Sequence, residues 1–131
     1  MTAKALVLFA HGARDPEWAR PVQAVAQRLQ LQNPDLLISV SFLEFMQPTL
    51  EQCVAQMHAA MSSQQSDEVP LRIDILPFFI AQGGHLRNEV PVMLQTLQAS
   101  YPQIHFRLLP ALGELPSVQD AMARAIGGLI A

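Results

Sequence analysis

The sequence has a single cysteine, Cys53, and little charge. One cysteine cannot form an intramolecular disulfide or a cluster of thiolate metal ligands, so a reducing compartment, the cytoplasm, is expected. Only 15% of the residues are charged and the formal net charge is −3. A broad basic surface for nucleic acid is therefore not expected, and an anionic ligand must meet a local group of cations. The apolar run from Ala5 to Ala10 is too short to span a membrane and predicts a first strand instead of a signal sequence.

Apolar residues make up half of the chain, which predicts one compact domain over residues 1–131. Continuous apolar runs, typical of buried parallel strands, alternate with stretches whose apolar residues recur at helical spacing. The strands are expected at residues 4–10, 36–42, 71–80 and 104–109, and the helices begin near residues 16, 48, 85 and 117. Pro77 should interrupt or end the third strand, because it has no amide to donate. The polar residues 62–68 predict a surface loop.

This alternation predicts an α/β fold with right-handed crossovers and helices on both faces of a parallel sheet. We expect a flavodoxin-like, three-layer sandwich whose central four-stranded sheet has the strand order 2-1-3-4. In that order the first and third strands are neighbours, and ligands bind beyond their carboxyl ends. His11 follows the first strand and His85 follows the third. The two imidazoles should therefore face each other across one crevice.

A carboxylate joins the two histidines, because Glu44 leaves the second strand. Two imidazoles and one carboxylate suit a borderline divalent metal such as cobalt, nickel, iron or zinc, and three ligands with open positions hold an ion without enclosing it. Each residue also has a structural interpretation. A histidine at a strand end can be a hydrogen-bonded structural group, and Glu44 can cap the helix that begins near Pro48.

Further candidates for ligand contact surround the two histidines in the sequence. They are Arg14, Arg87, Gly83, Gly84, Phe78 and Phe79. The arginines lie in the two glycine-histidine turns, where they are either anion contacts or ordinary surface residues. The phenylalanines lie where they can touch a flat apolar ligand or pack into the core.

Three segments together resemble the small, single-domain sirohydrochlorin cobaltochelatases, the CbiX-type class II chelatases. They are His11–Pro16, the strand exit Phe42–Glu44 followed by Pro48, and Leu76–Pro91. The likeness spans nearly the whole chain in the right order, and it extends to the siroheme ferrochelatases and nickel chelatases of the same superfamily.

The resemblance implies ATP-independent insertion of a divalent metal, cobalt first and iron or nickel as alternatives, into sirohydrochlorin for cobalamin or siroheme synthesis. It implies a homodimer with no tightly bound cofactor, in which the metal is a substrate. By position, His11 and His85 match the metal-binding and catalytic histidines of the family, and Glu44 matches an assisting acid. The family more often has serine where this chain has Ala13, and Asp-Ile where this chain has Glu89-Val90.

The chemistry of insertion agrees with this assignment. The metal must shed water while two pyrrole nitrogens lose protons, so the site needs loose ligands that are also bases. Neutral histidine serves as both near pH 7. Cations and exposed amides at the glycine turns would meet the carboxylates of sirohydrochlorin.

Other classes of protein explain the same residues less well. A histidine phosphatase has an arginine directly before its first histidine, where this chain has Ala10, and the Gly-x-Ser-x-Gly elbow of α/β-hydrolases is absent. A metal or tetrapyrrole carrier, and an assembly subunit whose site a partner completes, stay open as alternatives.

Overall fold

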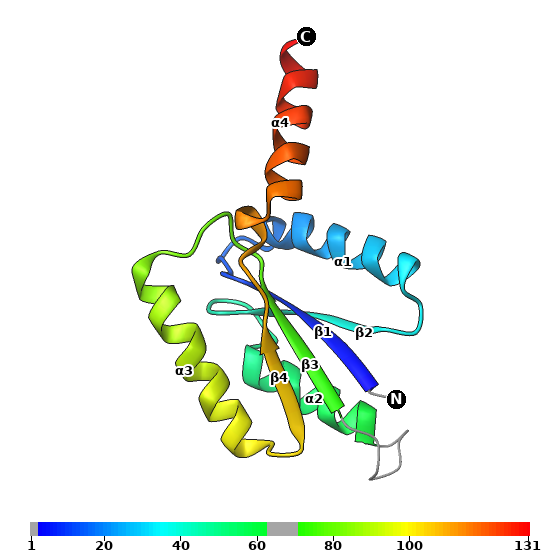
Figure 1. The fold of residues 1–131 in the computed structure, drawn as a ribbon, viewed down its shortest axis with the longest axis vertical. Helices are drawn as coiled ribbons and strands as arrows, with labels where there is room; N and C mark the ends of the chain where they lie inside the picture. The colour runs from blue at the N-terminus through cyan, green and yellow to red at the C-terminus, as the bar shows by residue number, and fades with distance from the viewer. Residues whose placement is uncertain (1–2, 63–70) are drawn as a thin grey trace.

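A four-stranded parallel sheet forms the centre of the molecule (Figure 1). The computed structural model describes residues 3–62 and 71–131, apart from the side chains of Ala3, Ser62 and His85, so most of the polar loop predicted at residues 62–68 lies outside the described residues. The strands are β1 Ala3–Ala10, β2 Leu37–Phe42, β3 Leu71–Pro77 and β4 Ile104–Leu108. All paired strands are parallel, and their order β2-β1-β3-β4 confirms the predicted topology.

Helices follow each strand, as the sequence predicts. The helical segments are η1 Pro16–Ala19, α1 Arg20–Gln32, α2 Leu50–Ser62, α3 Gly84–Ser100, η2 Leu112–Glu114 and α4 Pro116–Ile130. The segment η1 is a short 3-10 helix, begun by the Asp15 carboxylate, which accepts a hydrogen bond from the Glu17 amide at 3.0 Å. The α-helix expected from residue 16 therefore begins only at Arg20.

Two hydrophobic cores lie on the two faces of the sheet. Val7 and Phe9 of β1 pack with residues of α2 and α3, whereas Leu8 and Ala10 pack with residues of α1. Successive side chains of a strand point to opposite faces, so β1 is buried on both sides, as its continuous apolar sequence predicts. Pro77 is the last residue of β3, which ends three residues earlier than its apolar run.

The last helix, α4, does not cover the sheet. It begins at the end of the molecule where the strands end, and it points away from the body (Figure 1). None of its side chains is buried in the described structure. Layers of helix are thus present on both faces, but α4 contributes to neither. Within the described ranges, no helix combines the length and the apolar character that a bilayer crossing requires.

Candidate active site

His11 and Glu44 meet at the carboxyl ends of two neighbouring strands. The parallel register pairs Ala10 with Phe42, and the pairing continues into the loops, where the Glu44 amide donates to the His11 carbonyl at 3.1 Å. The side chains then come together, with His11 Nε2 at 3.0 Å from Glu44 Oε1. Both side chains are about half exposed, at 47% and 49%. Backbone hydrogen bonds therefore hold the two loops that carry the pair, and both side chains are accessible to a ligand.

Gly12 makes this close approach of the two loops possible. Its φ is +96°, a conformation that residues with a side chain rarely adopt. A Cβ atom on Gly12 would lie 1.9 Å from the backbone oxygen of Glu44. Only glycine lets the turn after β1 contact the loop after β2, so Gly12 sets the distance between His11 and Glu44.

The exit of β3 borders His11 on its other side. The Phe78 amide donates to the Phe9 carbonyl at 2.7 Å, which keeps this segment beside β1 beyond Pro77. The rings of Phe79 and His11 then form a T-shaped pair, with 6.5 Å between centroids and 68° between the ring planes. Phe78 points the other way and packs against the core on the α1 side. Of the two phenylalanines, Phe79 is thus the neighbour of His11.

The glycine turn after β3 leads directly into α3. Gly83 is the N-cap and Gly84 the first residue of the helix, and a Cβ atom on either would meet nothing within 4 Å. The backbone of His85 lies in this first helical turn, and its side chain is outside the described structure. Arg87 is exposed and donates from Nη2 to the Gln82 carbonyl at 3.3 Å. The turn therefore presents open backbone and a cation at a helix N-terminus.

Arg14 lies over an aromatic ring that our sequence interpretation did not include. Its guanidinium carbon is 5.1 Å from the ring centroid of Phe45, a residue that is 58% exposed. Phe45 has a φ of +67°, an uncommon conformation for a bulky residue and one that concentrates at functional sites. Its position directly after Glu44 was the available signal, but no sequence pattern predicts a positive φ at phenylalanine.

A comparison with protein families decides where this chain belongs. The model of the family described as CbiX matches residues 5–128. The chain belongs to the CbiX family. His11 directly follows β1 and Glu44 lies two residues after β2, whereas His85 lies in the first turn of α3, beyond the loop that follows β3.

Curated relatives and solved structures are similar to this CbiX-family chain. The sirohydrochlorin cobaltochelatase of Methanococcus aeolicus is 30% identical over 72% of this chain and 61% of that protein. The sirohydrochlorin ferrochelatase of Priestia megaterium is 30% identical over 76% of this chain and 35% of that protein. The matched part thus spans less than two thirds of these relatives.

Two solved structures share the fold. A cobalamin biosynthesis CbiX protein from Marinobacter aquaeolei has a TM-score of 0.80 at 23% identity, with 97% of each chain covered. The sirohydrochlorin chelatase SirB from Bacillus subtilis subspecies spizizenii, in complex with cobalt, has a TM-score of 0.73 at 19% identity. That likeness covers 98% of this chain and 51% of SirB.

Glu44 does not cap α2, so that alternative from the sequence is wrong. The helix begins with a reciprocal pair at Thr49 and Gln52. The Gln52 amide donates to Thr49 Oγ1 at 3.2 Å, and the Thr49 amide donates to Gln52 Oε1 at 3.0 Å. This capping box satisfies the helix end without Glu44. The Glu44 carboxylate is therefore available to His11.

Among the side chains that the structure describes, which do not include that of His85, no group of three or more His, Cys, Asp or Glu residues could hold a metal ion.

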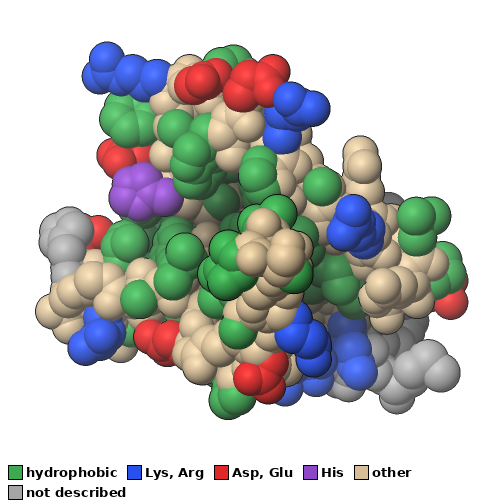
Figure 2. Space-filling model, turned by 90° about the horizontal axis from the view of Figure 1, so that it is seen from above, with side chains coloured by type: hydrophobic (Ala, Val, Ile, Leu, Met, Phe, Trp, Pro, Cys, Tyr) green, Lys and Arg blue, Asp and Glu red, His purple; other side chains and the backbone are tan. Residues whose placement is uncertain are grey.

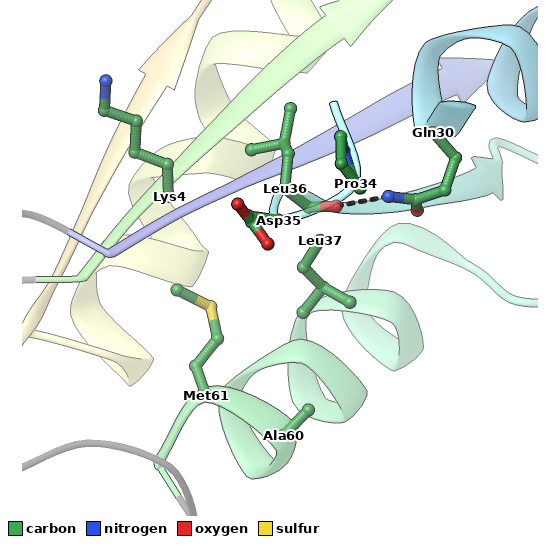
Figure 3. Close-up of a pocket in the computed structure, with 8 residues that line it drawn as sticks. All are labelled: Lys4, Gln30, Pro34, Asp35, Leu36, Leu37, Ala60 and Met61. Carbon is green, nitrogen blue, oxygen red and sulfur yellow. Dashed lines mark hydrogen bonds between the residues drawn. The ribbon is translucent and has the colours of Figure 1, made fainter. Parts of the chain in front are cut away.

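A separate hollow of about 370 Å³ lies at the opposite end of the sheet, near the start of β1 and β2 (Figure 3). Its lining is Lys4, Gln30, Pro34, Asp35, Leu36, Leu37, Ala60 and Met61. This hollow shares no residue with the candidate site, so we do not assign the chemistry to it.

Proposed function

We propose that this chain inserts a divalent metal into sirohydrochlorin without ATP. Cobalt is the first choice, because relatives named cobaltochelatase are among the similar proteins, and iron is the second, because one relative is named ferrochelatase. Nickel is the third, from the resemblance alone. The observation that carries the proposal is the His11–Glu44 pair, 3.0 Å apart and half exposed at the carboxyl ends of β1 and β2.

In this proposal His11 is both a metal ligand and a base. When Nε2–H donates to the Glu44 carboxylate, the lone pair on Nδ1 is left to bind the incoming metal or to accept a proton. A carboxylate in this position orients the ring and raises its basicity, so Glu44 acts through His11. His85, at the start of α3, is the second metal-binding and catalytic histidine. Two protein ligands hold the ion loosely enough to be transferred.

The reaction releases two protons from pyrrole nitrogens as the metal enters the ring. A neutral imidazole can take up one such proton near pH 7, and half-exposed side chains can pass it to water. We assign this step to His11 and His85 on one side of the macrocycle. The metal would leave each imidazole lone pair as it enters the ring, and the freed lone pair would then accept one pyrrole proton. Two protons leave as one divalent ion enters, so the net charge of the macrocycle is unchanged.

The carboxylates of sirohydrochlorin would be bound at the rim of the site. Arg14 and Arg87 are exposed cations on the two turns, and the amides of Gly83 and Gly84 are open at the beginning of α3. Both phenylalanines are partly buried and pack against a core, Phe78 on the α1 side and Phe79 on the other side. Phe79 is the stronger candidate for ring contact, because its ring neighbours the His11 imidazole.

The proposal includes the setting of the enzyme. It acts in the cytoplasm as a homodimer of single chelatase-like domains over residues 1–131. It has no tightly bound cofactor, since the metal is its substrate, and it uses neither nucleic acid nor membrane as a partner. The low charge and the single cysteine support this setting.

Anaerobic turnover of sirohydrochlorin, followed by visible absorption, tests the proposal. Cobalt, iron and nickel are supplied separately, and the uncatalysed rate is subtracted for each metal. Wild type should turn over many times, and His11→Ala and His85→Ala should lose at least about 100-fold in rate, as removal of a base does. Each variant is first checked for folding by circular dichroism.

A matched pair of variants isolates the carboxylate. Glu44→Gln keeps the shape of the side chain but removes its charge, and it should slow insertion at least about tenfold. Glu51→Gln makes the same change at an exposed position of α2 and should have no effect. If the protein binds metal and sirohydrochlorin tightly but does not raise the insertion rate above background, the chelatase proposal is rejected and a metal or tetrapyrrole carrier is favoured. Activity that returns only with a second protein would favour the assembly subunit.

A further inference from the structure

Phe45 is a large apolar side chain that the described structure leaves mostly in water. Leu43 and Met46, which flank it in the loop after β2, pack against the two hydrophobic cores, one on each face of the sheet. Phe45 lies outside both cores and is 58% exposed. Apolar side chains stabilise a fold by leaving water. Packing therefore gives little reason for a phenylalanine at this position.

The backbone at Phe45 is also unfavourable for a bulky residue. Its φ of +67° lies in the left-handed region, where the Cβ atom crowds the following carbonyl oxygen. Backbone hydrogen bonds on both sides hold the loop in this conformation. The Phe42 amide donates to the Pro48 carbonyl at 2.9 Å, and the Glu44 amide donates to the His11 carbonyl at 3.1 Å. Conformations imposed in this way concentrate at sites that bind ligands.

Phe45 does make one specific contact, with Arg14. The guanidinium carbon lies over the ring at 5.1 Å from its centroid, within the range of about 6 Å over which a cation is attracted to an aromatic face. Within the part of the chain that the structure describes, Arg14 forms no hydrogen bond or ion pair. The ring is therefore what holds the guanidinium, and all the N–H donors of Arg14 stay available to a ligand.

The two residues stand next to the His11–Glu44 pair. Arg14 lies three residues after His11 in the turn after β1, and Phe45 directly follows Glu44. Seen from the carboxyl end of the sheet, an acidic side chain lies beside a histidine, with hydrophobic and basic side chains beyond them at the edge of the molecule (Figure 2). A macrocycle with its centre at His11 would extend its edge toward this rim. The edge is where sirohydrochlorin carries its carboxylates.

We propose that Phe45 is a positioning residue, which holds Arg14 ready to bind one peripheral carboxylate of the tetrapyrrole. This inference deepens the proposed function and rests on it. A guanidinium is a planar fork that can donate two parallel hydrogen bonds to one carboxylate. A free arginine side chain loses rotamer freedom when it binds, whereas one already ordered by a ring loses less. Phe45 thus strengthens binding through Arg14, and the two together favour tetrapyrroles with a carboxylate at that edge.

Titration of the protein with sirohydrochlorin in the absence of any metal, followed by visible absorption, tests the proposal. Arg14→Gln should raise the dissociation constant at least about tenfold, because a hydrogen-bonded charge is lost. Phe45→Leu keeps an apolar side chain but removes the aromatic face, and it should raise the constant about two- to fivefold. Phe45→Tyr keeps the face and should bind as wild type. Arg28→Gln removes an exposed arginine of α1 and should also bind as wild type.

A double variant separates positioning from direct contact with the macrocycle. If Phe45 acts through Arg14, adding Phe45→Leu to Arg14→Gln should weaken binding no further. A ring that contacted the macrocycle by itself would weaken binding by the same factor with or without Arg14. That additive result would overturn the proposal. So would a Phe45→Leu variant that binds sirohydrochlorin as tightly as wild type.

Urea unfolding tests whether Phe45 instead serves the fold. Phe45→Gly suits the left-handed backbone, so its unfolding midpoint should be no lower than that of wild type while its affinity for sirohydrochlorin falls. A clear drop in the midpoint would assign Phe45 a structural role and overturn the proposal. Because the titrations contain no metal, a wild type that binds sirohydrochlorin but inserts no metal rejects only the proposed function. A wild type that inserts metal, with variants that do not follow the expected affinities, rejects only the role of Phe45.

Discussion

Replacing Gly12 by alanine should separate the two loops that carry His11 and Glu44. The added Cβ would lie 1.9 Å from the Glu44 carbonyl oxygen, where real Cβ contacts are essentially never under 3.0 Å. One of the loops must therefore retreat by at least 1.1 Å, the difference between these two distances. The His11–Glu44 contact of 3.0 Å cannot survive such a shift without rearrangement.

The free-energy cost of Gly12→Ala follows from the same geometry. Holding alanine at φ +96° costs about 1–2 kcal/mol. The shift also endangers two backbone hydrogen bonds, from Leu43 to Ala10 and from Glu44 to His11, each worth about 1 kcal/mol. We expect a loss of about 2–4 kcal/mol in unfolding free energy. If His11 and Glu44 act as we propose, displacing the pair by about 1 Å should lower turnover about 100-fold.

Urea unfolding measures the expected loss of unfolding free energy in Gly12→Ala, and the insertion assay measures the expected loss of turnover. Gly127→Ala is the matched control, since its Cβ would meet nothing within 4 Å and alanine favours the helix by about 0.5–1 kcal/mol. This control should be as stable as wild type or slightly more stable, and fully active. If Gly12→Ala unfolds within about 0.5 kcal/mol of wild type and retains its rate, our account of this turn is refuted.

Three further predictions concern stability and reactivity. Burial raises the pKa of the Cys53 thiol from 9.0 to about 11, so native protein should resist alkylation by iodoacetamide until urea unfolds it. The free energy of unfolding contributed by the buried neutral thiol is complete below pH 9.0 and is lost as pH rises through about 11. Fast alkylation of the native protein would contradict this prediction. Asp74→Ala should lower the free energy of unfolding in urea by about 3 kcal/mol, because the Asp74 side chain is 12% exposed and its carboxylate accepts hydrogen bonds from Arg107 at 2.7 and 3.0 Å. A loss under about 1 kcal/mol would show that solvent screens the ion pair. Thr49→Ala should cost about 1 kcal/mol by the same measurement through loss of the α2 cap, and Thr49→Ser should cost little.

Much of the site was predictable because it depends on topology. Hydrophobic runs and helical spacing predict the element order, and right-handed crossovers then predict neighbouring β1 and β3. Residues directly after those strands must lie at one edge of the sheet. His11 and the turn that begins α3 were located in this way. The positions of their side chains depend on loop conformations, which periodicity does not encode.

The sequence by itself determined the fold class, the strand order and the strand ends at which the candidate site lies, because these follow from local hydrophobic patterns and chain handedness. Only the tertiary structure decided that Glu44 contacts His11 instead of capping α2, that Phe45 lies under Arg14, and that α4 leaves its own sheet. The first and the third depend on a close backbone approach, at Gly12 and at Gly113, and the second accompanies the positive φ of Phe45. Such approaches arise between segments far apart in the sequence, where the space beside one residue is set by the backbone of another.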